Sequence, residues 1–129
     1  MRHLILFSNH LNIAYIKNAH PDKITVLVTK EQFEFVSYHQ FRILYHISAS
    51  YHFAKDHQIN YVYKDSLHEF FSDLDSSQHI IMYEQNDTWM KESIQKEVRH
   101  LNVTLLKDIN FYFQEIEKEF NKPPYKLDP

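Results

Sequence analysis

Hydrophobic positions along the chain fall into short continuous runs, separated by longer segments in which they recur every three or four residues. The runs are HLILF at 3–7, KITVLV at 23–28, INYVY at 59–63, HIIMY at 79–83 and VTLL at 103–106. Short apolar runs, several of them rich in β-branched residues, are typical of strands that are covered on both faces. The pattern therefore predicts five strands, with the first buried and the second covered on both faces.

The longest segment with helical periodicity is residues 38–57, YHQFRILYHISASYHFAKDH, between the second and third predicted strands. Its apolar positions form two neighbouring stripes. One stripe contains Phe41, Leu44, Tyr45, Ser48 and His52, and the other contains Ile43, Ile47, Tyr51 and Ala54. Residues at this spacing share one side of a helix. We therefore expect the two stripes to form one broad buried face.

Shorter helices are predicted at 66–74, at about 87–100 and at 111–120. Ser66 is a plausible N-cap with Glu69 at the capping-box position, and Asp87 is a plausible N-cap of the next helix. The inward residues of that helix are predicted to be Met90, Ile94, Val98 and Leu101. Residues 11–22 are ambiguous, with a helical turn that closes before Pro21, and residues 29–37 are interpreted as a connection.

Strands that alternate with helices predict a three-layer, Rossmann-like α/β domain with a five-stranded parallel sheet in the order 3-2-1-4-5. We expect this domain to span residues 1–120, followed at 121–129 by an extended tail or the start of an interdomain linker. In such sheets, ligands bind beyond the carboxyl ends of the strands. That rule selects the loops at 8–12, 29–32, 63–65, 84–87 and 107–110.

Composition narrows the functional classes. The chain has 129 residues, 43% of them hydrophobic, which fits one folded domain. Its 14 basic and 17 acidic residues are interspersed, so DNA is not predicted as a direct ligand. No apolar run approaches the roughly 20 residues of a membrane span, and no signal-peptide core is visible. We expect a cytoplasmic protein without a membrane partner.

The sequence contains no glycine and no cysteine. Dinucleotide-binding and P-loop motifs need glycine where the backbone approaches phosphate, so both motifs are excluded. The absence of cysteine excludes disulfides, iron–sulfur ligation and thiol catalysis within these residues. His39, His46 and His57 share a helical stripe, but neighbours would lie roughly 10 and roughly 16 Å apart, too far for common metal ligation.

Several segments match a known pattern in order. HQFRI at 39–43 and SASYHFA at 48–54 resemble HKxK(I/L) and SAMRHFA, and a strand containing YVY follows. FSNHLN at 7–12 resembles a GDQL segment, YEQND at 83–87 an E-P-x-D segment, and DINF at 108–111 a D-x-x-F segment. Together, over about residues 4–120, they resemble the photolyase and cryptochrome superfamily, specifically the deoxyribodipyrimidine photolyase-related branch.

The resemblance implies an N-terminal α/β domain that can hold an antenna chromophore, either a lumazine, a pterin or a deazaflavin. In that superfamily FAD and the DNA lesion belong to a following all-helical domain. The implied partner is therefore the FAD-binding helical domain of the same parent chain, with DNA reached only through it. The parent is implied to act in light-dependent DNA repair or blue-light sensing, with no complete catalytic site in these 129 residues.

The expected cofactor-binding side chains follow from the functional edge and the resemblance. They are Asn9, Thr29, Glu31, His39, Arg42, Glu84 and Asp87. The sequence departs from the superfamily by placing Thr29 where a glutamate is common, and Ser8-Asn9-His10 where Gly-Asp-Gln is common. A polar helix face explains His39 and Arg42 equally well, and helix capping is the simpler role of Asp87.

A second function stays open. The chain can be a free-standing, non-enzymatic ligand-binding or interaction module that kept the fold and lost photochemistry. An independent enzyme such as a nucleotidyl transferase ranks behind both, because no phosphate loop or nucleophile–base set is visible. Trp89 is expected to serve in core or interface packing.

Overall fold

The structure is a computed structural model that describes residues 1–34, 40–85 and 88–107. Its elements are β1 (Arg2–Leu6), α1 (Ile13–Ala19), β2 (Lys23–Thr29), α2 (Glu31–Glu34), α3 (Gln40–Asp56), β3 (Asn60–Lys64), α4 (Leu67–Phe71), β4 (His79–Tyr83), α5 (Thr88–Glu97) and β5 (Asn102–Leu106). All five predicted strands are present. The predicted helix at 111–120, the tail at 121–129 and the proposed cap Asp87 lie outside the described residues.

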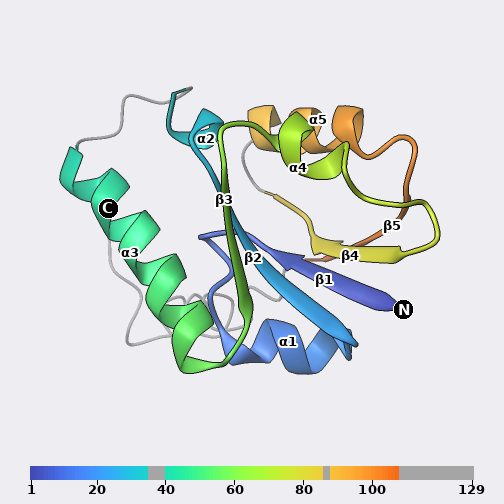
Figure 1. The fold of residues 1–129 in the computed structure, drawn as a ribbon, viewed down its shortest axis with the longest axis horizontal. Coiled ribbons are helices and arrows are strands. Elements are labelled where there is room, and N and C mark those ends of the chain that lie inside the picture. The colour runs from blue at the N-terminus through green and yellow to red at the C-terminus, as the bar shows by residue number, and fades with distance from the viewer. Residues whose placement is uncertain (35–39, 86–87, 108–129) are drawn as a thin grey trace, which may run out of the picture.

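The five strands form one parallel sheet in the order β3-β2-β1-β4-β5, which confirms the predicted Rossmann-like fold (Figure 1). Strand β1 lies at the centre, with Leu4 in register with Ile24 of β2 on one side and with Ile81 of β4 on the other. The chain builds the sheet outward from β1 in one direction and then returns to build the other half. The switch in strand order therefore lies between β1 and β4, where this fold class binds ligands.

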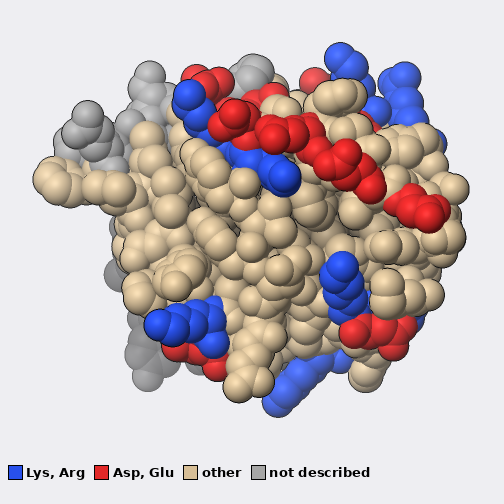
Figure 2. Space-filling view, viewed as in Figure 1, with Lys and Arg blue, Asp and Glu red and all other residues tan. Residues whose placement is uncertain are grey.

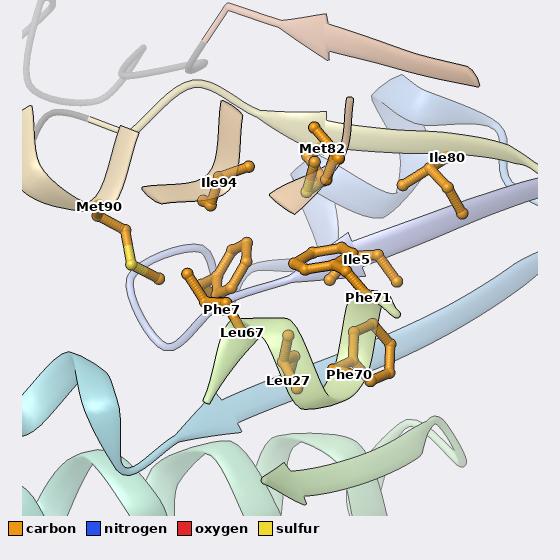
Figure 3. Close-up of a cluster of buried hydrophobic side chains, with 11 residues drawn as sticks. Ile5, Phe7, Leu27, Leu67, Phe70, Phe71, Ile80, Met82, Met90 and Ile94 are labelled. Carbon is orange, nitrogen blue, oxygen red and sulfur yellow. The ribbon is translucent and has the colours of Figure 1, made fainter. Parts of the chain in front are cut away.

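Helices cover both faces of the sheet, with α1 and α3 on one side and α4 and α5 on the other (Figure 1). Leu4, Leu6, Val26, Ile81 and Tyr83 pack with Ala19 and Ala54 on the α1–α3 face. The opposite face holds a larger cluster, shown in Figure 3, that joins sheet residues to the inner sides of α4 and α5. The three central strands β1, β2 and β4 are thus covered on both faces, which explains their continuous apolar runs, whereas the edge strands β3 and β5 are partly exposed.

The ambiguous segment after β1 forms a regular helix, α1. The side-chain oxygen of Asn12 accepts a hydrogen bond from the backbone nitrogen of Ala14 at 2.9 Å, which makes Asn12 the N-cap. The helix ends at His20, whose φ of 49° is left-handed, directly before Pro21. Residues 29–37 were expected to form a plain connection, but their first part contains the short helix α2.

The buried face of α3 differs from the predicted one. Phe41, Leu44 and Tyr45 are 77%, 61% and 70% exposed, although the sequence pattern predicted them to be buried. The residues that are buried or partly buried are Ile43, His46, Ile47, Ala49, Ser50, Phe53 and Ala54. α3 packs against β2 and β3, with the small side chains of Ser50 and Ala54 fully buried. Small residues allow close approach of helix and sheet, and this requirement decides the rotation of the helix.

The caps and inner faces of the later helices agree with the predictions. The Ser66 hydroxyl accepts from the backbone nitrogen of Glu69 at 3.2 Å, as an N-cap does. The Glu69 carboxylate reaches back to the backbone nitrogen of Asp65 at 3.3 Å, one residue earlier than in a standard capping box. In and after α5, Met90, Ile94 and Val98 are buried as predicted, and Leu101 is partly buried.

Charged side chains are mixed on the face shown in Figure 2. In the upper part of that view a band of aspartate and glutamate runs across the surface with lysine and arginine beside it, and the centre is largely uncharged. Within the described part of the chain, no helix is long and apolar enough to cross a membrane.

Candidate functional site

A pocket of about 200 Å³ lies beyond the carboxyl ends of β1, β2 and β4, the edge selected by the sequence. The loop after β1, helix α2, the loop after β4 and the facing sides of α3 and α5 all contribute to it. Its described lining residues are Phe7, Ser8, Asn9, Gln32, Phe33, Arg42, His46, Gln85, Trp89 and Met90.

One wall of the pocket is built by a hydrogen bond between loops that are distant in sequence. The side-chain nitrogen of Asn9 donates to Oε1 of Gln85 at 2.8 Å. Gln85 is buried, and its own Nε2 lies 3.5 Å from Nδ1 of His10 and 3.5 Å from the backbone oxygen of Tyr83. The loops after β1 and β4 are therefore tied together at the switch point.

A second set of polar contacts fixes the side of the pocket near β2. Nε2 of Gln32 donates to the hydroxyl of Ser8 at 3.3 Å. Oε1 of Gln32 accepts from the backbone nitrogen and from the hydroxyl of Thr29, both at 3.5 Å. Thr29 is fully buried, so it acts on the pocket by holding Gln32 in place.

Aromatic and apolar side chains complete the pocket. Phe7 and Met90 belong to the buried cluster between the sheet and α5, and they lie at one end of it in Figure 3. The ring of Phe33 lies 6.1 Å from the ring of His46, centroid to centroid. Trp89 adds a third aromatic side chain to the lining. The floor of the pocket is thus a continuation of the hydrophobic core.

Arg42 and His46 lie one turn apart on α3 and both line the pocket. Burial lowers the pKa of His46 below its ordinary value of 6.5, and the positive charge of Arg42 lowers it further. Both causes disfavour the imidazolium form. His46 therefore presents a neutral ring to the pocket at neutral pH.

A second hollow of about 370 Å³ adjoins the first along α3. Ser8, Asn9 and His46 line both hollows. The remaining described lining residues of the second hollow are Leu11, Tyr45, Ala49 and Phe53. The two hollows are therefore adjacent, with these three side chains between them, and are together called the groove. Small-molecule sites are commonly about 300–1,000 Å³. The second hollow falls within that range, and the first pocket is smaller.

The predicted site residues have different places in the structure. Asn9 and Arg42 line the pocket, and Thr29 lies buried behind Gln32. Oε1 of Glu31 accepts from the backbone nitrogen of Leu67 at 3.4 Å, at the start of α4. Glu84 lines a separate small hollow beside α5. His39 and Asp87 lie outside the described residues.

Several lining residues were not predicted individually. Ser8, Gln32 and Gln85 fall within the loops that the strand-end rule selected, so that rule contained the signal for them. Phe33, His46 and Trp89 carried no such signal, because their contribution depends on how α2, α3 and α5 are placed around the strand ends.

The lining offers groups for stacking and for hydrogen bonding. It combines a hydroxyl, three side-chain amides and several rings, which can hold a flat molecule by stacking and by directed hydrogen bonds. Within residues 1–34, 40–85 and 88–107, no group of three or more His, Cys, Asp or Glu side chains could hold a metal ion.

No protein-family model, curated protein or solved structure matches this chain. The case for a function therefore rests on the residues of the chain itself and on the groove that they form.

Proposed function

We propose that this chain is the chromophore-holding α/β domain of a photolyase- or cryptochrome-like protein, and that its pocket binds a lumazine, a pterin or a deazaflavin. The observation that carries this proposal is the lining of the pocket. Three side-chain amides, from Asn9, Gln32 and Gln85, converge with the rings of Phe33 and Trp89 at the switch in strand order.

The chemistry of these ligands fits such a lining. Each has a flat ring system whose faces gain from contact with apolar and aromatic side chains. Each also carries ring amide groups, which need partners that can both donate and accept hydrogen bonds. The Ser8 hydroxyl and the Asn9 amide offer both functions, and Gln32 and Gln85 hold these two side chains in place. A site built this way binds the ring itself, in agreement with a glycine-free chain that has no phosphate loop.

The resemblance in the sequence supports the same assignment. Ser8 and Asn9 come from the FSNHLN segment, Arg42 from HQFRI and Gln85 from YEQND. These three segments are far apart in the chain, yet each contributes to the lining of one pocket.

For the parent protein, the proposal is light-dependent DNA repair or blue-light sensing, in which a helical FAD domain carries the photochemistry and contacts DNA. The alternative is a free-standing module that binds a ligand or a partner without photochemistry. These two proposals can be distinguished by the absorption spectrum of the protein purified as its natural gene encodes it. A flavin absorption spectrum supports the first, whereas ring binding without any bound flavin supports the second.

Ligand binding can be tested with a reporter that is already in the pocket. Trp89 is the only tryptophan of the chain, and it lines the pocket. Titration of the purified protein with lumazine, pterin or a deazaflavin is expected to quench its fluorescence and to raise the melting temperature, because a ligand that binds only the folded state stabilises it.

A matched pair of substitutions separates pocket binding from surface adsorption. Ser8→Phe places a large ring between the two hollows of the groove, and Ser48→Phe makes the same change on the exposed side of α3. We expect Ser8→Phe to abolish quenching and Ser48→Phe to retain it. Unaltered Trp89 fluorescence and melting temperature with all three ligand classes would reject the proposed function.

A further inference from the structure

We infer that the pocket recognises a cyclic amide group on one edge of its ligand. The Ser8 hydroxyl donates a hydrogen bond to the ring carbonyl, and the Asn9 side-chain oxygen accepts one from the neighbouring ring N–H. This inference rests on the proposed function, because it specifies which part of a bound heteroaromatic ring the protein recognises. It is carried by the direction of the hydrogen bonds behind these two residues.

The direction of the first chain of hydrogen bonds is set by a backbone N–H. The backbone nitrogen of Thr29 can only donate, so the side-chain atom of Gln32 that faces it at 3.5 Å must be the oxygen. Nε2 of Gln32 then points to Ser8 and donates to its hydroxyl oxygen at 3.3 Å. Because the Ser8 oxygen accepts this bond, its hydroxyl hydrogen is left to donate elsewhere. Ser8 lines the pocket, so its hydroxyl hydrogen can donate to a ligand bound there.

The direction of the second chain is set by a backbone carbonyl. The backbone oxygen of Tyr83 can only accept, so Gln85 turns its Nε2 toward it at 3.5 Å. Oε1 of Gln85 consequently faces Asn9 and accepts from its Nδ2 at 2.8 Å. One of the two N–H groups of the Asn9 amide donates to Gln85, and the amide oxygen lies on the other branch of the group, where it can accept a hydrogen bond. The pocket therefore receives an acceptor from Asn9.

The two chains give adjacent residues opposite hydrogen-bonding roles, with Ser8 as donor and Asn9 as acceptor. A carbonyl next to an N–H within one ring presents the complementary pair on neighbouring atoms. Lumazine, pterin and the deazaflavin ring all contain such a cyclic amide. Gln32 and Gln85 make no hydrogen bond to the ligand in this arrangement. They are positioning residues that set the polarity of Ser8 and Asn9.

Three lumazines test this assignment through the fluorescence of Trp89. In 1,3-dimethyllumazine both ring N–H groups are replaced by N–CH3, whereas 6,7-dimethyllumazine carries the same two methyl groups on carbon and keeps both N–H groups. Relative to lumazine, we expect 1,3-dimethyllumazine to bind about tenfold more weakly, because the loss of one hydrogen bond costs about 1.4 kcal/mol. The 6,7-dimethyl compound is expected to bind within about threefold of lumazine, since each factor of ten requires about 1.4 kcal/mol.

Substitutions test which residue causes the difference in affinity between lumazine and 1,3-dimethyllumazine. Asn9→Leu has nearly the same shape but cannot accept a hydrogen bond, so this variant should bind lumazine and 1,3-dimethyllumazine equally well. Asn102→Leu, the same change at an exposed position at the start of β5, should leave the discrimination intact. Ser8→Ala is a second, smaller change. It should weaken the binding of lumazine about tenfold, because it removes the hydroxyl that donates to the ring carbonyl.

The outcomes separate this inference from the proposal beneath it. Equal affinity of the wild-type protein for lumazine and 1,3-dimethyllumazine would overturn the inference that the pocket recognises the cyclic amide. It would not contradict the proposal that the pocket binds the ring. Discrimination that persists in Asn9→Leu would overturn the role of Asn9. Absence of binding by lumazine, pterin and deazaflavin alike would reject the proposed function, and this inference with it.

Discussion

The side-chain nitrogen of Asn9 lies 2.8 Å from Oε1 of Gln85, although the two residues are 76 positions apart in the chain. Their loops follow β1 and β4, which are neighbours in the sheet at the switch in strand order. This bond closes one wall of the pocket and connects it to the buried side chain of His10 through Gln85. The geometry of the site therefore depends on the pairing of the two central strands.

The coupling between Asn9 and Gln85 can be measured in a double-mutant cycle. Asn9→Ala, Gln85→Ala and the double variant are compared by urea denaturation. We expect a coupling free energy of about 1 kcal/mol, the usual net contribution of a hydrogen bond. Gln85→Ala should cost the most, because Gln85 is buried and also faces His10 and Tyr83. Strictly additive effects would show that the bond does not join the loops in solution.

The titration of His46 should respond to Arg42. Burial lowers the pKa of His46, and the charge of Arg42 adds to this effect. Arg42→Gln is therefore expected to raise the pKa of His46 only part of the way back to 6.5, because the effect of burial remains. The imidazole resonances in an NMR pH titration measure the change. Lys55→Gln, at the other end of α3, is the control and should leave the titration unchanged.

Stability should decrease in mild acid because of His3. Its Nδ1 donates to Oε1 of Gln78 at 3.1 Å, so the neutral ring can accept from the Thr25 hydroxyl through Nε2 at 2.7 Å. Burial lowers the pKa of His3 below 6.5, and this effect exceeds the opposing effect of the Gln78 bond. The unfolded chain therefore binds the proton more readily than the folded chain does.

It follows that the contribution of His3 to stability is fully present above pH 6.5 and is lost as the pH falls below that value toward the lowered pKa of the folded state. Urea denaturation at several pH values between about 7 and 5 should show a decreasing free energy of unfolding. The slope should become shallower in His3→Gln. It should be unchanged in His52→Gln, which alters an exposed histidine. Equal slopes in all three proteins would contradict the role of His3.

The rotation of α3 predicts opposite effects at two positions that the sequence pattern placed on the same buried face. Leu44→Ser should change the free energy of unfolding by less than about 0.5 kcal/mol, because Leu44 is largely exposed. Ala54→Leu should cost about 1–3 kcal/mol, because Ala54 is fully buried between α3 and the sheet. Thermal or urea denaturation measures both. A large loss in Leu44→Ser would mean that this side of α3 is covered.

Local pattern was sufficient for the strands and for several caps. HIIMY matches β4 residue for residue, and Ser66 caps α4 as its position before an apolar stripe indicated. The cap depends on contacts within a few residues, and β4 is recognisable because its cover on both faces requires a short continuous apolar run. The parallel strand order also followed from the alternation of strands and helices, because short right-handed crossovers leave few arrangements.

The face of α3 could not be obtained in the same way. Hydrophobic residues surround much of that helix, so periodicity alone did not distinguish Leu44 from Ile47. The decision came from the sheet, which the helix can approach closely only through Ser50 and Ala54. The predicted site residue Thr29 illustrates the same limit. It is at the expected strand end, yet its side chain is buried behind Gln32.

By itself, then, the sequence determined which segments are strands, in what order they pair, which chemistries lack the necessary residues, and at which edge a ligand should bind. Only the tertiary structure decided which side chains at that edge meet. Gln32, Gln85 and His46 reach the pocket from three different elements. The physical reason is that the hydrophobic period of a strand or helix and the capping of a helix are local, whereas a pocket is formed by side chains whose distances depend on strand pairing and helix packing.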